Sequence, residues 1–298
     1  MEELLFIYNP QAGQGKARGK LADIVNAFST NGYLTTVYPT QAPGDATGLV
    51  RAIGKRYGRI VCCGGDGTLH EVVAALMEMD APPVLGYIPA GTTNDFSRNL
   101  DLPRDMAQAA EIAAAGPTMR CDMGRFNGKS FVYVAAFGAF TDVSYDTPQQ
   151  FKNLFGHLAY VLEGIGRLGS IRSWNMRVEY DGGELEGEFI FGMVSNTRSV
   201  GGFKGWPAQE VELDDGQFEV ILVRAPKNPL ELQAILHSVI TQSPGGDGPL
   251  VGFHTRSLKL TCGEEVAWTL DGEYGGSHRE VQVENVQKAL ELCYRKKN

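Results

Sequence analysis

The 298-residue sequence lacks several features that would identify other classes of protein. It has only five cysteines and no C-x-x-C pair, which argues against a disulfide scaffold or a zinc site. No apolar run approaches the roughly 18 residues that a membrane-spanning helix requires. The formal net charge is -8, which makes a nucleic-acid partner unexpected because phosphate backbones attract basic surfaces.

The amino terminus also lacks the pattern of a secretion signal. Residues 1–8 carry two glutamates and a short apolar run, so we expect a first β-strand there. The cysteines are read as reduced core residues, which predicts a cytoplasmic protein. Because an acidic chain is repelled on average by anionic lipid, any membrane contact is expected to be local and transient.

The first part of the chain alternates strand-like and helical patterns. Strands are expected at 4–8, 34–38, 59–63 and 84–88, and helices at 16–31, 44–57, 68–79 and 104–115. Strands separated by helices predict a parallel sheet in a three-layer α/β domain, here covering residues 1–122. Ligands of such domains bind at the carboxyl ends of the strands.

The pattern changes near Met123. Strands are then expected at 124–138, 174–180, 187–196, 217–223, 255–262 and 265–270, and helices at 152–168 and 229–241. Many strands separated by turn residues predict a mostly antiparallel domain over 123–285, which we expect to be a β-sandwich.

Two glycine-containing segments follow apolar runs of the first domain. They are Gly64-Gly65-Asp66-Gly67-Thr68 and Pro89-Ala90-Gly91-Thr92-Thr93-Asn94-Asp95-Phe96. Each is therefore expected to form a loop after a buried strand. Glycine lets backbone N–H groups approach an anion, and a following helix N-terminus adds a favourable dipole. The pair predicts a nucleotide site that needs no Walker lysine.

A third turn closes the first expected strand, at Asn9-Pro10-Gln11-Ala12-Gly13. Its amides could face a phosphate, although an ordinary strand-to-helix turn is the alternative. The glycines at 13, 15 and 19 miss the Rossmann spacing by one residue. Gly19-Lys20 is followed by Leu21, so a Walker A motif is excluded as well.

Asp66 lies among three glycines. A carboxylate beside a polyphosphate is repulsive unless a cation intervenes, so Asp66 is expected to position a Mg²⁺-bound nucleotide. Helix capping is the alternative, but it leaves the glycines unexplained. By the same logic Thr92 should meet the nucleotide, and Asn94 or Asp95 should frame the cleft.

The two glycine segments and the residues after them resemble the diacylglycerol kinase catalytic family. The first continues as Leu69-His70-Glu71-Val72, and the second as Ser97-Arg98. That family includes soluble bacterial diacylglycerol kinases and the sphingosine and ceramide kinases. GGDGT alone also resembles loops of NAD kinases and phosphofructokinases, but both segments at this spacing are specific. The resemblance extends from Asn9 to Glu273.

The resemblance implies ATP as co-substrate, Mg²⁺, and transfer of the γ-phosphate to a lipid hydroxyl, most simply that of diacylglycerol. It also implies that residues 286–298 return to the first domain. Arg18 is a further candidate to reach the phosphates. The residues expected to contact ATP are Asn9, Pro10, Gln11, Ala12, Gly13, Lys16, Thr40, Gly64, Gly65, Asp66, Gly67, Thr68, Leu69, His70, Glu71, Gly91, Thr92, Asn94 and Asp95.

Leu270-Asp271-Gly272-Glu273 indicates a turn by itself. In the family the matching acid is the general base, so Glu273 is expected to take the proton of the lipid hydroxyl. Asp271 is expected to orient Glu273 or to help bind metal. Since phosphoryl transfer mostly needs positioning and charge neutralisation, Asp66, Asp271 and Glu273 form the expected catalytic set.

The segment Leu213-Asp214-Asp215-Gly216-Gln217 resembles one that holds a structural Mg²⁺ in the bacterial enzymes. The implied ligands are Glu212, Asp215 and Gln217, a set of carboxylate and carbonyl oxygens that suits a hard cation. A hairpin corner is the alternative, because Asp-Asp-Gly is common at turns.

The acceptor stays open at this point. The expected partner is a lipid at a membrane surface, but phosphatidylglycerol, a sphingoid base or a non-lipid alcohol are alternatives. A nucleotide sensor without turnover and a homodimer also stay open. Aromatic residues over 151–165 and a loop around Trp206 are candidates for lipid contact, with a core-facing helix as the alternative to the former.

Overall fold

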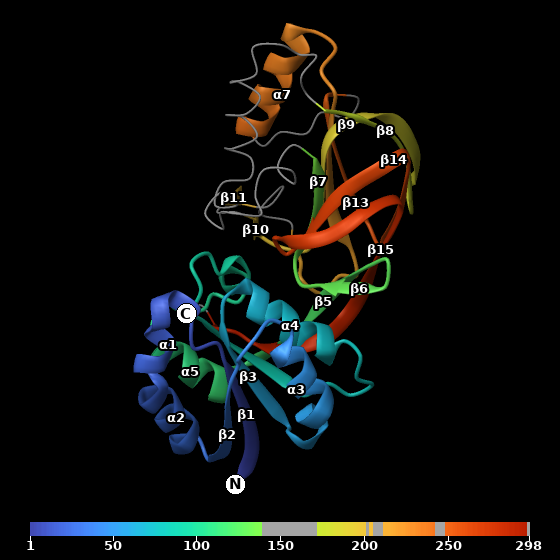
Figure 1. Cartoon of the computed structure of the whole chain (residues 1–298). Coiled ribbons are helices and arrows are strands. Elements are labelled where there is room, and N and C mark those ends of the chain that lie inside the picture. Colours follow the sequence, from blue (N-terminus) through green and yellow to red (C-terminus); the bar gives the residue numbers. More distant parts are fainter. Residues whose placement is uncertain (139–171, 201–202, 205–210, 242–247, 297–298) are drawn as a thin grey trace. The chain divides into compact units, whose positions relative to one another are not determined.

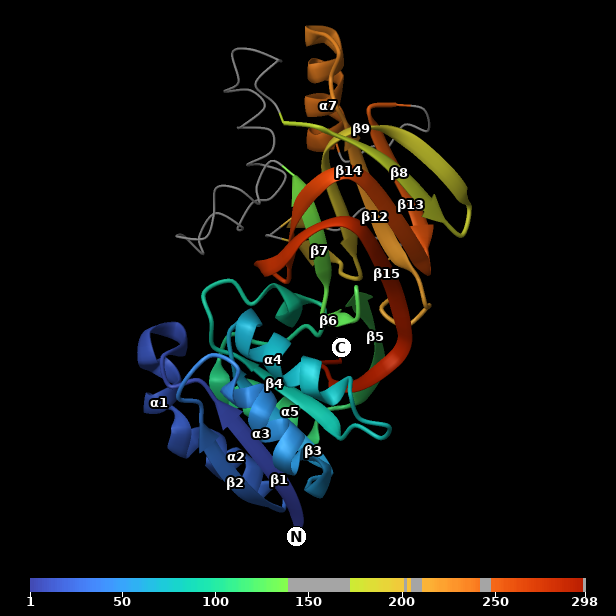
Figure 2. The same cartoon turned by 45° about the vertical axis from the view of Figure 1, so that its right-hand side comes forward.

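A computed structural model describes residues 1–138, 172–200, 203–204, 211–241 and 248–296 (Figures 1 and 2). The chain divides into two compact units. Unit 1 comprises residues 1–123 and 287–298, and unit 2 comprises residues 124–286. The expected helix over 152–168 and the loop around Trp206 lie outside the described residues.

Unit 1 contains parallel strands in the order β4-β3-β1-β2. The end of the long strand β15, Glu273–Cys293, adds to β4 through the pair Leu292 and Leu85, also in parallel. The bounds are β1 Glu2–Tyr8, β2 Tyr33–Pro39, β3 Arg59–Gly64 and β4 Val84–Pro89.

Helices follow these strands along the chain. They are α1 Lys16–Gly19, α2 Leu21–Thr30, α3 Asp45–Ile53, α4 Asp66–Leu76 and α5 Met106–Ala115, with 3-10 turns at Ala12–Gly15, Gly54–Arg56 and Asp95–Arg98. Asp105 caps α5 by accepting a hydrogen bond from the Gln108 N–H at 2.9 Å. The single helix predicted over 16–31 is wrong, because the chain leaves helical geometry at Lys20, directly after the poor helix former Gly19.

The core of unit 1 follows from the alternation of side chains along β1. Leu4 and Phe6 share one buried cluster with Ile24 of α2 and Ala110 of α5. Gly86 of β4 lets α5 approach closely, since a Cβ atom there would lie 2.7 Å from the Ala113 Cβ. The apolar runs seen in the sequence are therefore strands buried by helices.

Unit 2 is dominated by antiparallel strands. Together with the parallel strands and helices of unit 1, this confirms the predicted mixture of α/β and antiparallel structure. Strands β5 and β15 each continue from one unit into the other. The bounds are β5 Thr118–Phe126, β6 Lys129–Phe131, β7 Val134–Gly138, β8 Trp174–Tyr180, β9 Gly183–Ser195, β10 Ser199–Val200, β11 Phe203–Lys204, β12 Phe218–Arg224, β13 Leu250–Thr255, β14 Ser257–Leu270 and helix α7 Pro229–Thr241.

The two separate sheets expected of a β-sandwich are wrong for the described strands. β7 pairs with β9, β9 with β8, β8 with β14, and β14 again with β7, which closes a hydrogen-bonded ring. The physical reason is strand length: β9 and β14 span 13 and 14 residues, so each pairs with different neighbours at its two ends. The longer path of the sheet is β13-β12-β9-β7-β14-β15.

The single strand predicted over 124–138 is also wrong. It is divided into β5, β6 and β7, and β5 and β6 form a hairpin. Asn127 and Gly128 take φ angles of +46° and +82° at its corner. Asn-Gly is a strong hairpin signal because both residues tolerate left-handed backbone, so the sequence did contain the information.

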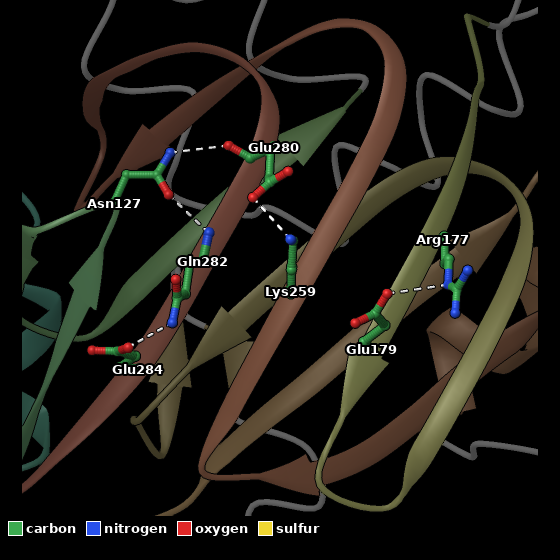
Figure 3. Close-up of polar contacts among 7 residues, drawn as sticks. All are labelled: Asn127, Arg177, Glu179, Lys259, Glu280, Gln282 and Glu284. Atoms are coloured by element: carbon green, nitrogen blue, oxygen red, sulfur yellow. Dashed lines mark hydrogen bonds and ion pairs between the residues drawn. The ribbon is translucent and has the colours of Figure 1, made fainter.

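The interior and exterior of unit 2 differ sharply. Trp268 is buried between Phe126 and Phe137, with ring centroids 5.0 and 4.8 Å away. Polar side chains occupy the exposed surface shown in Figure 3, where Lys259 Nζ lies 2.9 Å from Glu280 Oε1. Exposed ion pairs contribute at most about 1 kcal/mol each, so the aromatic interior stabilises this unit.

Among the described residues, no helix combines the length and the apolar character needed to cross a lipid bilayer. Within the described part of unit 2, α7 is the helix, and the other elements are strands.

Candidate active site

Three loops of unit 1 meet at the carboxyl ends of β1, β3 and β4. The Asn9 N–H donates to the Cys63 carbonyl at 2.9 Å, which joins the first loop to the end of β3. The Ala90 N–H donates to the Gly64 carbonyl at 2.8 Å, which joins the third loop to the second. The structure thus brings together the three segments that the sequence predicted to hold a nucleotide.

Glycine is required where these loops touch. A Cβ atom at Gly91 would lie 2.5 Å from the Cα of Gly65, and one at Gly13 would lie 2.4 Å from the Ala90 carbonyl oxygen. A Cβ atom at Gly64 would lie 2.5 Å from Thr68. These distances are far shorter than any normal contact, so the loops pack backbone against backbone.

The first loop has an unusual backbone. Gly13, Gln14 and Gly15 take successive φ angles of +59°, +61° and +81°. Gln14 is the costly member, because a side chain disfavours the left-handed region. Lys16 follows directly and is exposed at the start of α1. This places a lysine beside the loop as predicted, although contact with a phosphate stays a prediction.

The remaining predicted residues of this loop and of β2 also lie near the strand ends. Gln11 donates its N–H to the side chain of Asn9 at 2.9 Å, in a local turn that leaves Gln11 exposed. The Asn9 Nδ2 lies 3.5 Å from Thr68 Oγ1. Thr40 donates its N–H to the Tyr8 carbonyl at 2.9 Å, which places it beside the end of β1.

Asn94 shapes the third loop from inside. Its Oδ1 accepts the Gly91 N–H and its Nδ2 donates to the Gly91 carbonyl, both at 2.8 Å. Its φ of +52° is one that asparagine tolerates better than most residues. The expected role of Asn94 in framing the site therefore has a local cause.

Tyr87 was missed by the sequence analysis. Its hydroxyl lies 3.3 Å from both the Gly64 carbonyl and Asn94 Oδ1, so it links the second and third loops. Burial, and then the negative charge of Asp66, raises the pKa of Tyr87 well above its ordinary value, which keeps the hydroxyl a donor. The only signal was one tyrosine within the apolar run of β4.

Asp66 and Asp95 come together although 29 residues separate them. The Asp95 N–H lies 3.4 Å from Asp66 Oδ2, and Asp95 is 3% exposed. Arg98 approaches Asp95 with 3.9 Å between Nη1 and Oδ1. Two carboxylates from adjoining loops are oxygen ligands of the kind that Mg²⁺ prefers, so this donor set fits the expected cation.

Two predicted nucleotide residues of α4 have structural roles. Leu69 is fully buried in unit 1. Glu71 accepts the Gly44 N–H at 2.8 Å and the Ala46 N–H at 3.1 Å, so its carboxylate caps the start of α3. His70 is half-buried on the same helix. Sequence alone did not reveal the capping, because the partners lie 25 to 27 residues away.

The predicted acids of unit 2 lie on the turn between β14 and β15. Asp271 and Gly272 have φ angles of +52° and +91°, and Leu270 pairs with Glu273. Two left-handed central residues define a tight type I′ hairpin turn. Glu273 is exposed, whereas Asp271 is 5% exposed and accepts hydrogen bonds from backbone amides. The two acids therefore have opposite environments.

The expected structural Mg²⁺ ligands form a turn. Asp215 Oδ1 accepts the Gln217 N–H at 2.9 Å, and the Gln217 carbonyl accepts the Asn285 amide at 3.1 Å. Glu212 is exposed. Within the described part of the chain, no group of three or more histidine, cysteine, aspartate or glutamate side chains is arranged to hold a metal. The turn contacts account for these residues, and the metal ligation stays a prediction.

Comparison with known proteins connects this geometry to a family. A model of the diacylglycerol kinase catalytic domain matches residues 3–126, which include all three loops. A curated diacylglycerol kinase from Bacillus subtilis strain 168 is 36% identical over 278 residues, covering 93% of this chain and 91% of its own length. The chain belongs to the diacylglycerol kinase family.

Other relatives extend this assignment beyond the matched domain. A diacylglycerol kinase from Staphylococcus aureus strain MRSA252 is 35% identical over 272 residues, covering 91% of this chain and 85% of the relative. A solved diacylglycerol kinase structure from Bacillus anthracis strain Sterne covers 99% of this chain and 97% of its own, with 26% identity and a TM-score of 0.77. The diacylglycerol kinase family assignment makes this chain a lipid kinase and thus an enzyme.

Proposed function

We propose that the enzyme transfers the γ-phosphate of ATP to the hydroxyl of diacylglycerol, giving phosphatidic acid and ADP. The observation that carries the proposal is the direct packing of Gly65 against Gly91, which joins two glycine loops at adjacent strand ends. Bare backbone at the start of α4 supplies N–H groups and a helix dipole to a polyphosphate. A three-layer α/β unit with its ligand at the carboxyl ends of the strands is the expected frame.

In this proposal the three loops bind the nucleotide. The exposed Lys16 and Arg18 supply positive charge to the phosphates. Asp66 and Asp95 hold Mg²⁺, which neutralises charge on the phosphate oxygens when it is bound. The capping role of Glu71 and the burial of Leu69 leave those two residues as support for the loops rather than ligand contacts.

Glu273 is the proposed general base. Its exposed carboxylate accepts the proton of the lipid hydroxyl while the hydroxyl oxygen forms a bond to the γ-phosphorus. The bond from the γ-phosphorus to the bridging oxygen breaks, and ADP leaves with that electron pair. Phosphoryl transfer of this kind depends on placement and charge neutralisation more than on covalent catalysis.

The acceptor is proposed to be met at a membrane surface from the cytoplasm, by transient peripheral contact and without nucleic acid. The structural Mg²⁺ at Asp215 and assembly as a homodimer belong to the same proposal. These points depend on the family likeness and on the charge of -8, which disfavours a permanent attachment to anionic lipid.

The test is a phosphate-transfer assay with γ-labelled ATP, Mg²⁺ and micelles that each contain one acceptor. The acceptors are diacylglycerol, phosphatidylglycerol, sphingosine and glycerol, with a metal chelator as the blank. Label in diacylglycerol, lost with the chelator, is the expected result. Label in another acceptor would overturn the assigned substrate. ATP binding without label in any acceptor would overturn the transfer reaction and favour a nucleotide sensor.

A further inference from the structure

Asp271 is a buried carboxylate enclosed by the backbone of a neighbouring segment. Its Oδ2 accepts the Val132 N–H at 2.7 Å, and its Oδ1 accepts those of Tyr133 at 2.9 Å and Val134 at 3.2 Å. Its own N–H donates to the Val134 carbonyl at 2.8 Å. Four hydrogen bonds therefore tie one residue of the β14–β15 turn to residues 132–134.

Residues 132 and 133 link β6 to β7, which begins at Val134, and the three consecutive N–H groups of residues 132–134 converge on one side chain. We name these three N–H groups the amide cradle. It is held in turn, because the Tyr133 carbonyl accepts the Asn196 N–H at 3.0 Å and Asn196 is buried. Three N–H donors require a group that only accepts hydrogen bonds. An ionised carboxylate is such a group, whereas a carboxamide also has an NH₂ donor.

The position of Asp271 determines the position of Glu273. The turn has two central residues, so Glu273 starts β15 directly after Gly272 and opposite Leu270. Asp271 holds a left-handed φ of +52° at 5% exposure, while Glu273 is exposed. A loss of the bonds to the amide cradle would release the backbone that carries Glu273.

We propose that Asp271 is a positioning residue of the phosphoryl-transfer site. It fixes the β14–β15 turn on the amide cradle, so that Glu273 is presented to the acceptor hydroxyl. We assign it neither metal binding nor proton transfer, because three of its roughly four acceptor positions already hold backbone N–H groups. The effect on Glu273 rests on the proposed function, whereas the anchoring by the cradle does not.

Two substitutions separate these roles. Asp271→Asn keeps a residue that tolerates positive φ, but it turns an NH₂ group toward one of the cradle donors. Asp271→Gly also suits the turn and leaves the cradle empty, as a site for a small carboxylate such as formate. The matched control is Asp181→Asn, because Asp181 accepts the Arg256 N–H at 2.8 Å at an exposed hairpin of the same unit.

Kinetics give the first readout. Both Asp271 variants should lower kcat by roughly 10- to 100-fold, since a displacement of about 1 Å costs that much in positioned catalysis. The KM for ATP and the midpoint of the acidic limb of the pH profile should stay at their wild-type values. Formate, against chloride at equal ionic strength, should raise kcat of Asp271→Gly but not of Glu273→Ala or of the wild type.

Several kinetic results would overturn the proposal. Wild-type kcat in Asp271→Gly would show that the turn needs no anchor. Activity that returns with excess Mg²⁺ rather than formate would make Asp271 a metal ligand. An acidic limb that disappears in Asp271→Asn would make Asp271 the titrating base. A loss of kcat equal to that of Asp181→Asn would reduce the effect to general destabilisation.

Amide hydrogen exchange gives a readout that needs no acceptor. In Asp271→Gly the N–H groups of Val132, Tyr133 and Val134 should exchange faster, and formate should slow them again. Unchanged exchange would overturn the anchoring whatever the kinetics show. If the wild type transfers no phosphate while exchange responds as expected, the proposed function fails, and the positioning of a catalytic base fails with it, but the cradle stands.

Discussion

The loops of unit 1 and the β14–β15 turn of unit 2 use the same backbone groups in opposite ways. The loops pack backbone against backbone because Gly13, Gly65 and Gly91 have no side chain where the loops touch. The turn uses N–H groups of residues 132–134 to hold a side chain of its own, Asp271. A side chain added in the loops should therefore disturb unit 1, whereas removal of the Asp271 carboxylate should disturb the turn of unit 2.

This difference also separates ligand binding from placement. A backbone site left open can accept phosphate, whereas a backbone site filled by a carboxylate fixes two segments to each other. Substitutions in the loops should therefore change nucleotide affinity, and substitutions in the turn should change kcat.

Glu273→Gln should lower kcat by roughly 100- to 10,000-fold, because the exposed carboxylate that accepts the proton is replaced by an amide. The Kd for ATP, measured by calorimetry, should not change. An amide of equal size keeps the fold, so the melting temperature serves as the control. Retained turnover would show that Glu273 does not accept the proton and that the turn does not carry the catalytic base.

Gly91→Ala should weaken ATP binding by about tenfold or more, which corresponds to about 1.4 kcal/mol. Its Cβ atom would lie 2.5 Å from the Cα of Gly65, so the two loops must separate. Gly48→Ala is the control, since Gly48 lies in α3 with nothing within 4 Å, and alanine there should stabilise by about 0.5–1 kcal/mol. Equal ATP affinity in both variants would mean that the contact between the two loops is not needed for ATP binding.

Glu71→Gln should lower the free energy of unfolding by about 1–2 kcal/mol, because an amide replaces one of the two oxygens that cap α3. ATP affinity should stay close to wild type. The matched control is Glu78→Gln, which breaks the exposed pair between Arg51 of α3 and the turn that follows α4 and should cost less than about 1 kcal/mol. A large loss of ATP affinity in Glu71→Gln would show that Glu71 belongs to the nucleotide site.

Alkaline pH should change the free energy of unfolding and leave the ligand contacts untouched. Burial raises the pKa of the Cys63 thiol from 9.0 to about 12, and burial also raises that of Cys62. Between these pH values the unfolded chain loses a proton that the folded chain keeps. The free energy of unfolding should therefore fall as pH rises through this window, by up to about 1.4 kcal/mol per pH unit and thiol. Below pH 9.0 the thiols should have no effect.

Urea unfolding of the wild type and of Cys63→Val at several alkaline pH values measures this slope. Valine fills the same apolar space but cannot ionise, so the variant should show a shallower decline in the free energy of unfolding. Identical slopes would mean that the thiol does not contribute. The test concerns the buried strand β3 that carries the second loop, and not the ligand contacts themselves.

Sequence predicted the three loops because each signal was local. An apolar run followed by glycine marks the end of a buried strand, and the structure has the loops after β1, β3 and β4. It did not predict the partners of Glu71 or Asp271, since the Asp271 bond to Val132 joins residues 139 positions apart. Composition carries no information on such pairs.

The errors within unit 2 have two different causes. The Asn127-Gly128 corner was a local signal that was overlooked, so the strand over 124–138 could have been divided correctly. The closed ring of β7, β9, β8 and β14 had no such signal, because pairing depends on which strands meet in space. Strand number can be estimated from turn residues, whereas strand partners cannot.

The interruption of unit 1 by unit 2 has a consequence for biosynthesis. Residues 1–123 leave the ribosome before residues 287–298, which contain the segment that pairs with β4. At about 5–20 residues per second, the roughly 160 intervening residues take roughly 8–30 seconds to translate. During that interval β4 lacks the partner that Leu292 later provides, and an open strand edge invites pairing with other chains. The newly made chain should therefore be most prone to aggregation until β15 is complete.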